Sequence, residues 1–490
     1  MLFNSLRFLL FFTVVLLVVP RLSWRRQNLF LLAASYFFYG SWDWRFVGLL
    51  LLTTTLDFVC GLRIAAATEP RGRRNWMLTG VIGSLSVLAV FKYCGFFVVS
   101  FGELLGRLGL EAHLPVLRIV LPVGISFYTF QSLSYTLDIY RGRLDPTRNF
   151  IDYALFVSFF PQLVAGPIER ARSLLTQVAA PRTITAEHVR RGVALLLVGY
   201  FKKVAIADTM APLAQAAFAD PAAHSAGQLA AGLYAFALQI YGDFSGYSDI
   251  ARGAASLLGF ELRVNFHAPY LSRSIAAFWQ RWHISLSSWV GDYLFQPLLG
   301  AATRRLAPRD LPLGLETRLA YALAVLPTML LMGLWHGAAW TFVAWGGFHG
   351  LLLALQRGLG GPARKWRRSR SLRAARWWRP AWSALQVVLT FHVVTLGWIL
   401  FRAESLADAG AYLRGLFHGG AWADFGWSVP FAALLLLLLD LGQQRWGEAG
   451  WLTAVPRAWR WVVAELLLVA TLAAAVQQAH TVTPFIYFRF

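Results

Sequence analysis

The chain has 490 residues, of which 57% are hydrophobic and only 14% are charged. Soluble domains are nearer one quarter charged, so this composition excludes a soluble enzyme, a disordered chain and a fibrous protein. The net charge is +21. The cations stand in short loops between apolar runs, which is the positive-inside pattern of membrane proteins and argues against nucleic acid as a partner.

Apolar runs of ~18 residues or more recur along the sequence and predict membrane-spanning helices. At ~20 residues per crossing, the length allows roughly ten to twelve spans. The predicted fold class is an all-α polytopic membrane protein, with re-entrant or amphipathic helices between some spans. No stretch is long enough to fold alone in water, so residues 1–490 are expected to form a single domain in the lipid bilayer.

The chain opens with five apolar runs, at residues 6–20, 28–42, 46–66, 76–100 and 116–139. The loops after the first, third and fifth runs are rich in arginine, whereas the other two contain acidic residues. Arginine-rich loops stay in the cytoplasm, so the N-terminus is predicted to lie outside. The first run lacks a basic leader and a small-residue cleavage site, and we expect it to remain as a span.

The middle of the chain is less regular. Residues 150–168 contain Pro161, Gly166 and Pro167, which favour a re-entrant or broken helix covered by other protein or lining a water-filled cavity. Residues 186–260 predict two or three helices with polar interruptions.

The strongest cytoplasmic marker is the stretch 362–380, which carries eight Arg or Lys and no acid. Counting on from it, residues 381–401 cross outward, 428–443 return and 461–477 cross outward again. The aromatic tail at 479–490 is therefore predicted to be periplasmic.

Ionisable side chains within spans are energetically costly and are candidates for function. Four histidines stand in apolar or aromatic surroundings: His283, His336, His349 and His392. Read as one helix, residues 278–297 place Trp279 and His283 on the same aromatic face. The alternative for His283 is a buried histidine that only packs.

His336 lies between Gly333 and Gly337, near the midpoint of residues 316–357. That stretch is long enough for two crossings of ~20 residues each, so a break near His336 is predicted. Apolar surroundings keep an imidazole neutral, and a neutral imidazole can act as a general base. A packing role is again the alternative. We expect His349 and His392 to be structural or to support a neighbouring site residue.

Several signatures are missing from the sequence. There is no Walker A motif, no G-x-S-x-G elbow, no H-E-x-x-H zinc helix and no H-x-x-x-x-D motif, and the two cysteines form no C-x-x-C pair. These absences argue against ATP-driven transport, serine hydrolysis and a metal site. Matched histidine pairs for haem are missing as well, so no permanently bound cofactor is expected.

Two further segments are candidates for function. Residues 239–249 place Asp243, Ser245 and Tyr247 in an apolar context. They are expected either to line a cavity or to form hydrogen bonds with another helix. Residues 484–490 are rich in aromatics. They form either an interfacial anchor or a segment that inserts into a cavity and presents Tyr487 there.

Five motifs together resemble the membrane-bound O-acyltransferases. They are ASYFFYGSWDW at 34–44, SFFPQLVAGPIER at 158–170, YGDFSGYSDIA at 241–251, FWQRWHISLSSW at 278–289 and WHGAAW at 335–340. Within that family the match is to the bacterial alginate O-acetyltransferase branch, over most of the chain. The stretch 290–300 departs from the commoner form of arginine followed by DYLY.

The resemblance implies a helical membrane fold around a central tunnel, with His336 as the catalytic histidine and His283 as the second signature histidine. His283 would orient a thioester or stabilise its oxyanion. Asp243, Ser245, Tyr247, Trp282 and Trp335 are candidate tunnel-lining residues. Lys202 and Lys203 are candidates for binding the phosphates of the acyl donor.

The branch is expected to work in the bacterial inner membrane. Its members move an acetyl group from a cytoplasmic donor, acetyl-CoA or an acyl carrier, to the outside. A periplasmic partner transferase then places it on alginate or a similar exopolysaccharide. Related D-alanyl transferases use a partner peptide with a tyrosine among C-terminal aromatics. The tail here is similar, which suggests Tyr487 as an acyl relay.

Three alternatives stay open at this point: a D-alanyl transferase with a carrier-protein donor, a lipid or protein long-chain acyltransferase, and a non-catalytic exporter component whose histidines line a pore.

Overall fold

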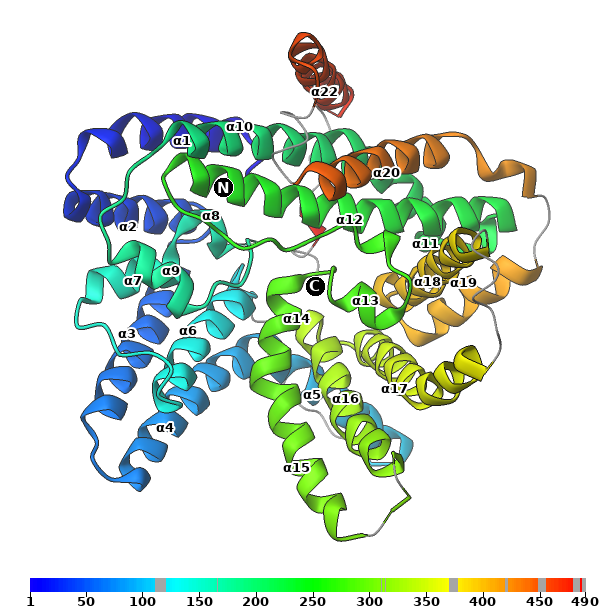
Figure 1. Cartoon of the computed structure of the whole chain (residues 1–490), viewed down its shortest axis with the longest axis horizontal. Coiled ribbons are helices and arrows are strands. Elements are labelled where there is room, and N and C mark those ends of the chain that lie inside the picture. Colours follow the sequence, from blue (N-terminus) through cyan, green and yellow to red (C-terminus); the bar gives the residue numbers. More distant parts are fainter. Residues whose placement is uncertain are drawn as a thin grey trace. The chain divides into compact units, whose positions relative to one another are not determined.

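The structure is a computed structural model that describes residues 1–110, 120–164, 166–309, 311–312, 314–369, 378–418, 422–447, 455–478 and 485–486. Every regular element in these ranges is a helix (Figure 1), as the composition predicts.

The described residues form two compact units. The first contains Met1–Tyr200 and Gly246–Arg263, and the second contains Phe201–Ser245 and Val264–Ile486. One long helix, α12 (Ala226–Leu257), contributes its N-terminal part to the second unit and its C-terminal part to the first. The assignment of the whole chain to a single domain stays a prediction.

Among the described residues, the first unit contains the C-terminal part of α12 and the following α-helices: α1 (Leu6–Val18), α2 (Trp24–Gly40), α3 (Arg45–Ala66), α4 (Pro70–Leu88), α5 (Cys94–Arg107), α6 (Ile125–Tyr140), α7 (Phe150–Ser158), α8 (Phe160–Leu163), α9 (Ala171–Val178) and α10 (Ala186–Tyr200). A π-helical turn, Ala89–Tyr93, joins α4 to α5. Helices α3, α4 and α6 pack together. Buried Asp57 of α3 joins them, because it accepts hydrogen bonds from Ser84 at 2.9 Å and from Thr136 at 3.2 Å.

The break predicted for residues 150–168 is confirmed. Asn149 caps α7 by accepting hydrogen bonds from the backbone N–H groups of Ile151 and Asp152, and α7 already ends at Ser158. Helix α8 begins immediately before Pro161, a position that tolerates proline because its N–H would have no helical partner.

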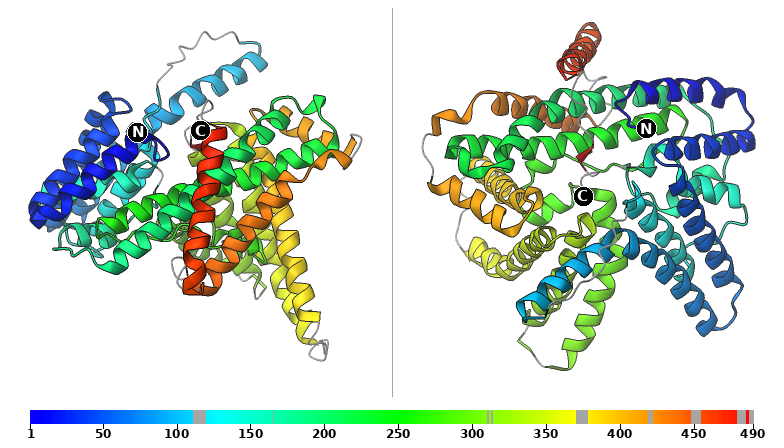
Figure 2. Two further views of the ribbon diagram at one scale, coloured as in Figure 1. Left: turned by 90° about the horizontal axis from the view of Figure 1, so that it is seen from above. Right: turned by 180° about the vertical axis from the view of Figure 1, so that it is seen from behind.

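The second unit begins with the π-helical segment η3 (Phe201–Asp208). After it come α11 (Thr209–Ala219), α12, α13 (Ile275–Trp279), α14 (Ile284–Val290), α15 (Gln296–Leu306), α16 (Leu315–His336), α17 (Trp340–Ser369), α18 (Trp378–Arg402), α19 (Leu406–His418), α20 (Ser428–Trp446) and α22 (Arg457–Gln477), seen from two further directions in Figure 2.

Two glycines, Gly333 of α16 and Gly346 of α17, let these helices cross with their backbones in contact. A Cβ atom at Gly333 would overlap the carbonyl of Phe342, and one at Gly346 would overlap the carbonyl of Met329. The close approach follows from the absent side chains. It fixes the C-terminal end of α16, where His336 lies.

Five helices among the described residues are long and apolar enough to cross a membrane. They are Arg45–Ala66, Pro70–Arg107, Leu315–His336, Pro380–Arg402 and Ala458–Gln477. The last of these exposes large apolar side chains such as Trp461 and Val476, which suits contact with lipid. The protein is therefore a multi-pass membrane protein. The total of ten to twelve crossings and the side on which each helix ends stay predictions.

Candidate active site

His336 is the last residue of α16, and the chain then runs extended through Gly337 before α17 begins at Trp340. The predicted break at this histidine is confirmed. The imidazole is buried and packs edge-on against aromatic rings, with centroid distances of 5.0 Å to Trp335, 5.1 Å to Trp345 and 5.4 Å to Phe401. These contacts come from three helices, so the ring is held in an apolar cage.

The reading of residues 278–297 as one helix is wrong. Helix α13 ends at Trp279, and His283 has a left-handed backbone, with φ 45° and ψ 53°, before α14 begins at Ile284. A left-handed conformation is uncommon outside glycine and costs energy, so other contacts must hold it. The faces assigned to a continuous helix therefore do not apply.

Asn265 supplies those contacts. Its side-chain oxygen lies 3.1 Å from Nδ1 of His283, and it accepts hydrogen bonds from the backbone N–H and the hydroxyl of Ser285 at 3.2 and 2.9 Å. The backbone carbonyl of Asn265 accepts a hydrogen bond from the N–H of Ile284 at 2.9 Å. Asn265 stands 18 residues before His283, and sequence reasoning missed it because no local pattern joins the two.

The same bonds assign the proton on His283. A backbone N–H can only donate, so the Asn265 atom that faces Ser285 is the oxygen, and Nδ1 of His283 must donate to it. Nε2 then carries the lone pair. His283 lies outside the five candidate spans, and burial lowers the pKa of its imidazole to about 3. The neutral imidazole is therefore an acceptor through Nε2.

The two histidines that stand 53 residues apart in sequence meet in the second unit. Their ring centroids are 6.5 Å apart, and Trp335 contacts both, at 6.2 Å from His283 and 5.0 Å from His336. Phe244 of α12 packs edge-on against His283 at 4.6 Å. The structure thus brings two buried imidazoles together within one cluster of aromatic rings, while their catalytic roles stay a prediction.

The other two histidines differ in surroundings. His349 of α17 is fully buried and packs against Trp279 at 5.2 Å and against Trp345 at 5.1 Å. Trp345 also packs on His336, so His349 supports one of the rings that surround His336. His392 of α18 is exposed, and its Nδ1 lies 2.7 Å from the carbonyl of Val388 within the same helix.

A buried ionic cluster lies on α12 and the preceding π-helical segment. Nζ of Lys203 is 2.8 Å from Oδ1 of Asp208 and 2.8 Å from Oδ1 of Asp243, and all three side chains are buried. The neighbouring Lys202 is also buried, with Nζ 5.9 Å from the ring centroid of Tyr241. Lys203 is therefore the internal counter-ion of two carboxylates, while the donor-phosphate role of both lysines stays a prediction.

The C-terminal tail meets this cluster. Phe485 and Ile486 are buried, and the backbone N–H of Ile486 donates a hydrogen bond to Oδ2 of Asp243 at 2.7 Å. The ring of Phe485 lies 5.7 Å from Phe244, the residue that packs on His283. These two tail residues are therefore buried within the protein and do not act as an anchor at the membrane interface. Tyr487 lies outside the described residues.

The remaining predicted tunnel residues lie in different surroundings. Trp282 is buried against Phe266 and Trp398, each at 5.1 Å. Ser245 is buried at the end of the part of α12 that belongs to the second unit. Tyr247 belongs to the first unit, where it stacks on Phe3 at 4.6 Å. Their role in lining a tunnel stays a prediction.

Comparison with known proteins decides the family. The model of the membrane-bound O-acyltransferase family matches residues 143–361, a range that includes both histidines. A probable alginate O-acetylase of Azotobacter vinelandii is 42% identical over 86% of this chain and 79% of its own length. The chain belongs to the membrane-bound O-acyltransferase family. It is therefore an O-acyltransferase of the membrane, similar to the alginate O-acetylases.

Two other relatives of this chain are named for different acceptors. The peptidoglycan O-acetyltransferase of Helicobacter pylori is 32% identical over 79% of this chain and 73% of its own length. The teichoic acid D-alanyltransferase of Bacillus subtilis is 26% identical over 60% of this chain and 72% of its own length. Membership in the O-acyltransferase family contradicts the non-catalytic exporter alternative.

Proposed function

We propose that this membrane-bound O-acyltransferase moves an acetyl group from cytoplasmic acetyl-CoA across the bacterial inner membrane for O-acetylation of alginate or a similar exopolysaccharide. The observation that carries the proposal is that His283, His336 and Phe485 belong to one cluster of aromatic rings, where Phe244 contacts both His283 and Phe485. The similarity to alginate O-acetylases supports this acceptor.

Transfer through the protein suits the chemistry of both substrates. Acetyl-CoA carries several charges and cannot cross lipid, whereas polysaccharide hydroxyls lie outside the cell. An enzyme with a site near the middle of the membrane needs to move only the small acetyl group. A periplasmic transferase is the proposed partner that places this group on the polymer.

The proposed chemistry has two acyl transfers. His336 removes the proton from the Tyr487 phenol, the phenolate oxygen attacks the thioester carbonyl, the C–S bond breaks, and the thiolate takes the proton from His336. In the second transfer an acceptor hydroxyl gives its proton to His336 and attacks the tyrosyl ester. The phenolate leaves and regains that proton.

The proton assignment changes the part given to His283. A neutral imidazole with its proton on Nδ1 donates to Asn265, so its Nε2 can accept a hydrogen bond but cannot donate one to an oxyanion. We therefore assign His283 to orienting the attacking hydroxyl or the proton of the leaving thiol. Oxyanion stabilisation would require the opposite tautomer.

Peptide mass spectrometry tests the proposal. Purified wild type, His336→Ala, Tyr487→Phe and the exposed control His392→Ala are incubated with acetyl-CoA, and their C-terminal peptides are compared. We expect an acetyl adduct of ~42 Da on the C-terminal peptide of wild type and of His392→Ala. His336→Ala and Tyr487→Phe should carry no adduct. An adduct that persists in Tyr487→Phe refutes the relay. Labelling from an acyl carrier protein alone refutes acetyl-CoA as the donor and favours the D-alanyl-like alternative.

A further inference from the structure

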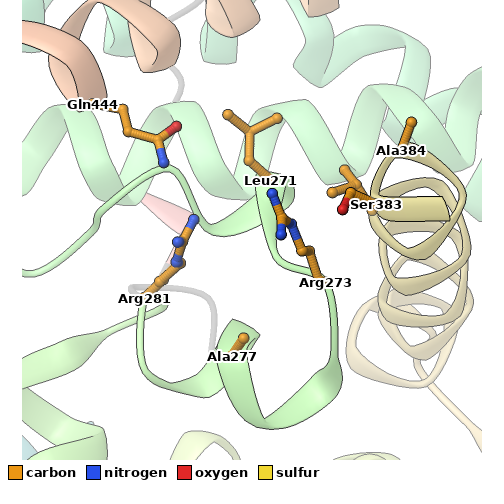
Figure 3. Close-up of a pocket in the computed structure, with 8 residues that line it drawn as sticks. Leu271, Arg273, Ala277, Arg281, Ser383, Ala384 and Gln444 are labelled. Atoms are coloured by element: carbon orange, nitrogen blue, oxygen red, sulfur yellow. The ribbon is translucent and has the colours of Figure 1, made fainter. Parts of the chain in front are cut away.

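A cavity of about 590 Å³ lies in the second unit, and neither histidine of the pair lines it. Arg273 and Arg281 rise from the chain on either side of α13, Gln444 reaches in from α20, and Ser383 comes from α18 (Figure 3). Leu271 and Ala277 complete the nearer wall. No motif in the sequence marks this set, because its members come from three separate stretches of the chain.

The cavity is electropositive. None of the described residues that line it is acidic, and within the described part of the chain neither Arg273 nor Arg281 forms an ion pair. Nη1 of Arg281 is buried without a hydrogen-bond partner in the same part of the chain. A buried guanidinium donor without an acceptor is costly. Lys203 shows the contrast, since two carboxylates compensate its charge.

The predicted topology places this cavity on the cytoplasmic side. Ser383 lies in the first turns of α18, directly after the basic stretch 362–380. Gln444 lies in the last turn of α20, next to Arg445. Under the positive-inside rule both helix ends face the cytoplasm. The cavity is therefore available to a ligand from that side.

The cavity is also joined to the histidine site by a short piece of chain. Arg281 is followed by Trp282 and His283, so the Cα atoms of Arg281 and His283 are at most ~7 Å apart. Trp282 packs on Tyr270 and Phe278, at 6.1 and 5.4 Å, and fixes this link. A ligand with a charged end and a long neutral arm could occupy both places.

We propose that this cavity binds the phosphate groups of the acyl donor, a coenzyme A thioester. Arg281 and Arg273 would each present a planar pair of N–H donors to phosphate oxygens, which is the geometry that guanidinium groups recognise best. Ser383 and Gln444 add neutral donors. The thioester at the far end of the pantetheine arm then lies toward His283. The assignment rests on the proposed function only in taking coenzyme A as the donor.

A binding measurement tests this without relying on turnover. Wild type, Arg273→Gln, Arg281→Gln and Arg281→Lys are purified in an uncharged detergent and titrated with coenzyme A by calorimetry. Arg305→Gln, an exposed arginine of α15, is the matched control. Each glutamine variant is expected to weaken coenzyme A binding at least tenfold, Arg281→Lys less, and Arg305→Gln not at all. Thermal unfolding confirms that each variant is folded. Arg273→Gln keeps the test valid if Arg281→Gln does not fold, because Arg273 is exposed.

The outcomes separate the two proposals. If wild type binds coenzyme A and both glutamine variants bind it equally well, the cavity is not the donor site, although the proposed function stands. If wild type binds no coenzyme A, acetyl-CoA fails as the donor and the assignment fails with it. Vesicles containing phosphatidylglycerol form the last arm. If the glutamine variants lose binding to these vesicles but still bind coenzyme A as wild type does, the cavity is a lipid headgroup site and the assignment is overturned.

Discussion

The backbone N–H of Ile486 donates a hydrogen bond to Oδ2 of Asp243 at 2.7 Å, while Oδ1 of the same carboxylate lies 2.8 Å from Nζ of Lys203. One buried carboxylate thus holds a buried cation and the C-terminal tail at once. The backbone of Ile486, rather than its side chain, makes this hydrogen bond.

Asp243→Ala should release the tail. It removes the acceptor of the Ile486 N–H and leaves Lys203 with Asp208 alone, and breaking a buried ion pair typically costs about 3–5 kcal/mol. We expect carboxypeptidase to remove the last residues much faster than in wild type, as measured by intact mass. Asp408→Ala, at an exposed aspartate of α19, is the control. Equal resistance of the Asp243→Ala tail would show that the hydrogen bond does not hold it.

Asn265→Asp should shift the pH dependence of acetyl transfer. A carboxylate beside Nδ1 stabilises the imidazolium form of His283, so its pKa rises by about 1–3 units above the depressed value. The acidic limb of the pH–rate profile should then move to higher pH, because more of the imidazole is protonated at a given pH. Asn265→Ala should lower kcat without this shift. A profile for Asn265→Asp that coincides with wild type would exclude His283 as an acceptor in the reaction.

Part of this structure follows from the sequence. The break at His336 follows from the length of residues 316–357 and the flanking glycines, and the broken segment at 150–168 follows from its prolines. Both are local signals, and both are confirmed by helix ends at His336 and Ser158.

The rest depends on contacts between distant residues. His283 has a left-handed backbone because Asn265 holds it, and helical periodicity cannot show such a contact. The sequence suggests Lys203 as a ligand of the donor phosphates, and only the structure shows its pairing with Asp208 and Asp243. Arg281 lines a cavity with residues from α18 and α20, and no local pattern in the sequence shows this. Sequence therefore identifies the two histidines but not the groups that orient them.

Gly346→Ala should destabilise the protein, because the new Cβ would overlap the backbone carbonyl of Met329 in α16. Overpacking of this kind costs about 1–3 kcal/mol, and it should also displace His336 and lower activity. Gly358→Ala on the same helix is the matched control, since a Cβ there meets nothing within 4 Å. Thermal unfolding in detergent should show a lower Tm for Gly346→Ala and an equal or higher Tm for Gly358→Ala. An unchanged Tm for Gly346→Ala would show that the two helices can separate freely.

Glu169 should make the stability of the protein depend on pH. It lies in the irregular segment after α8, where burial raises the pKa of its carboxyl from 4.5 to about 7, although the carboxylate accepts a hydrogen bond from the backbone N–H of Arg263 at 2.6 Å. Between these two values the folded state holds a proton that the unfolded state has lost, so stability is highest at low pH and falls as pH rises toward 7.

Each unit of pH in this window changes stability by about 1.4 kcal/mol at most. Glu169→Gln should therefore flatten the decline of Tm between about pH 4.5 and pH 7, and Glu187→Gln, at an exposed glutamate of α10, should leave it unchanged. Thermal unfolding across that range measures both. Parallel curves for wild type and Glu169→Gln would mean that the buried carboxyl titrates at its ordinary pKa, because the Arg263 guanidinium, 3.6 Å away, then offsets the burial.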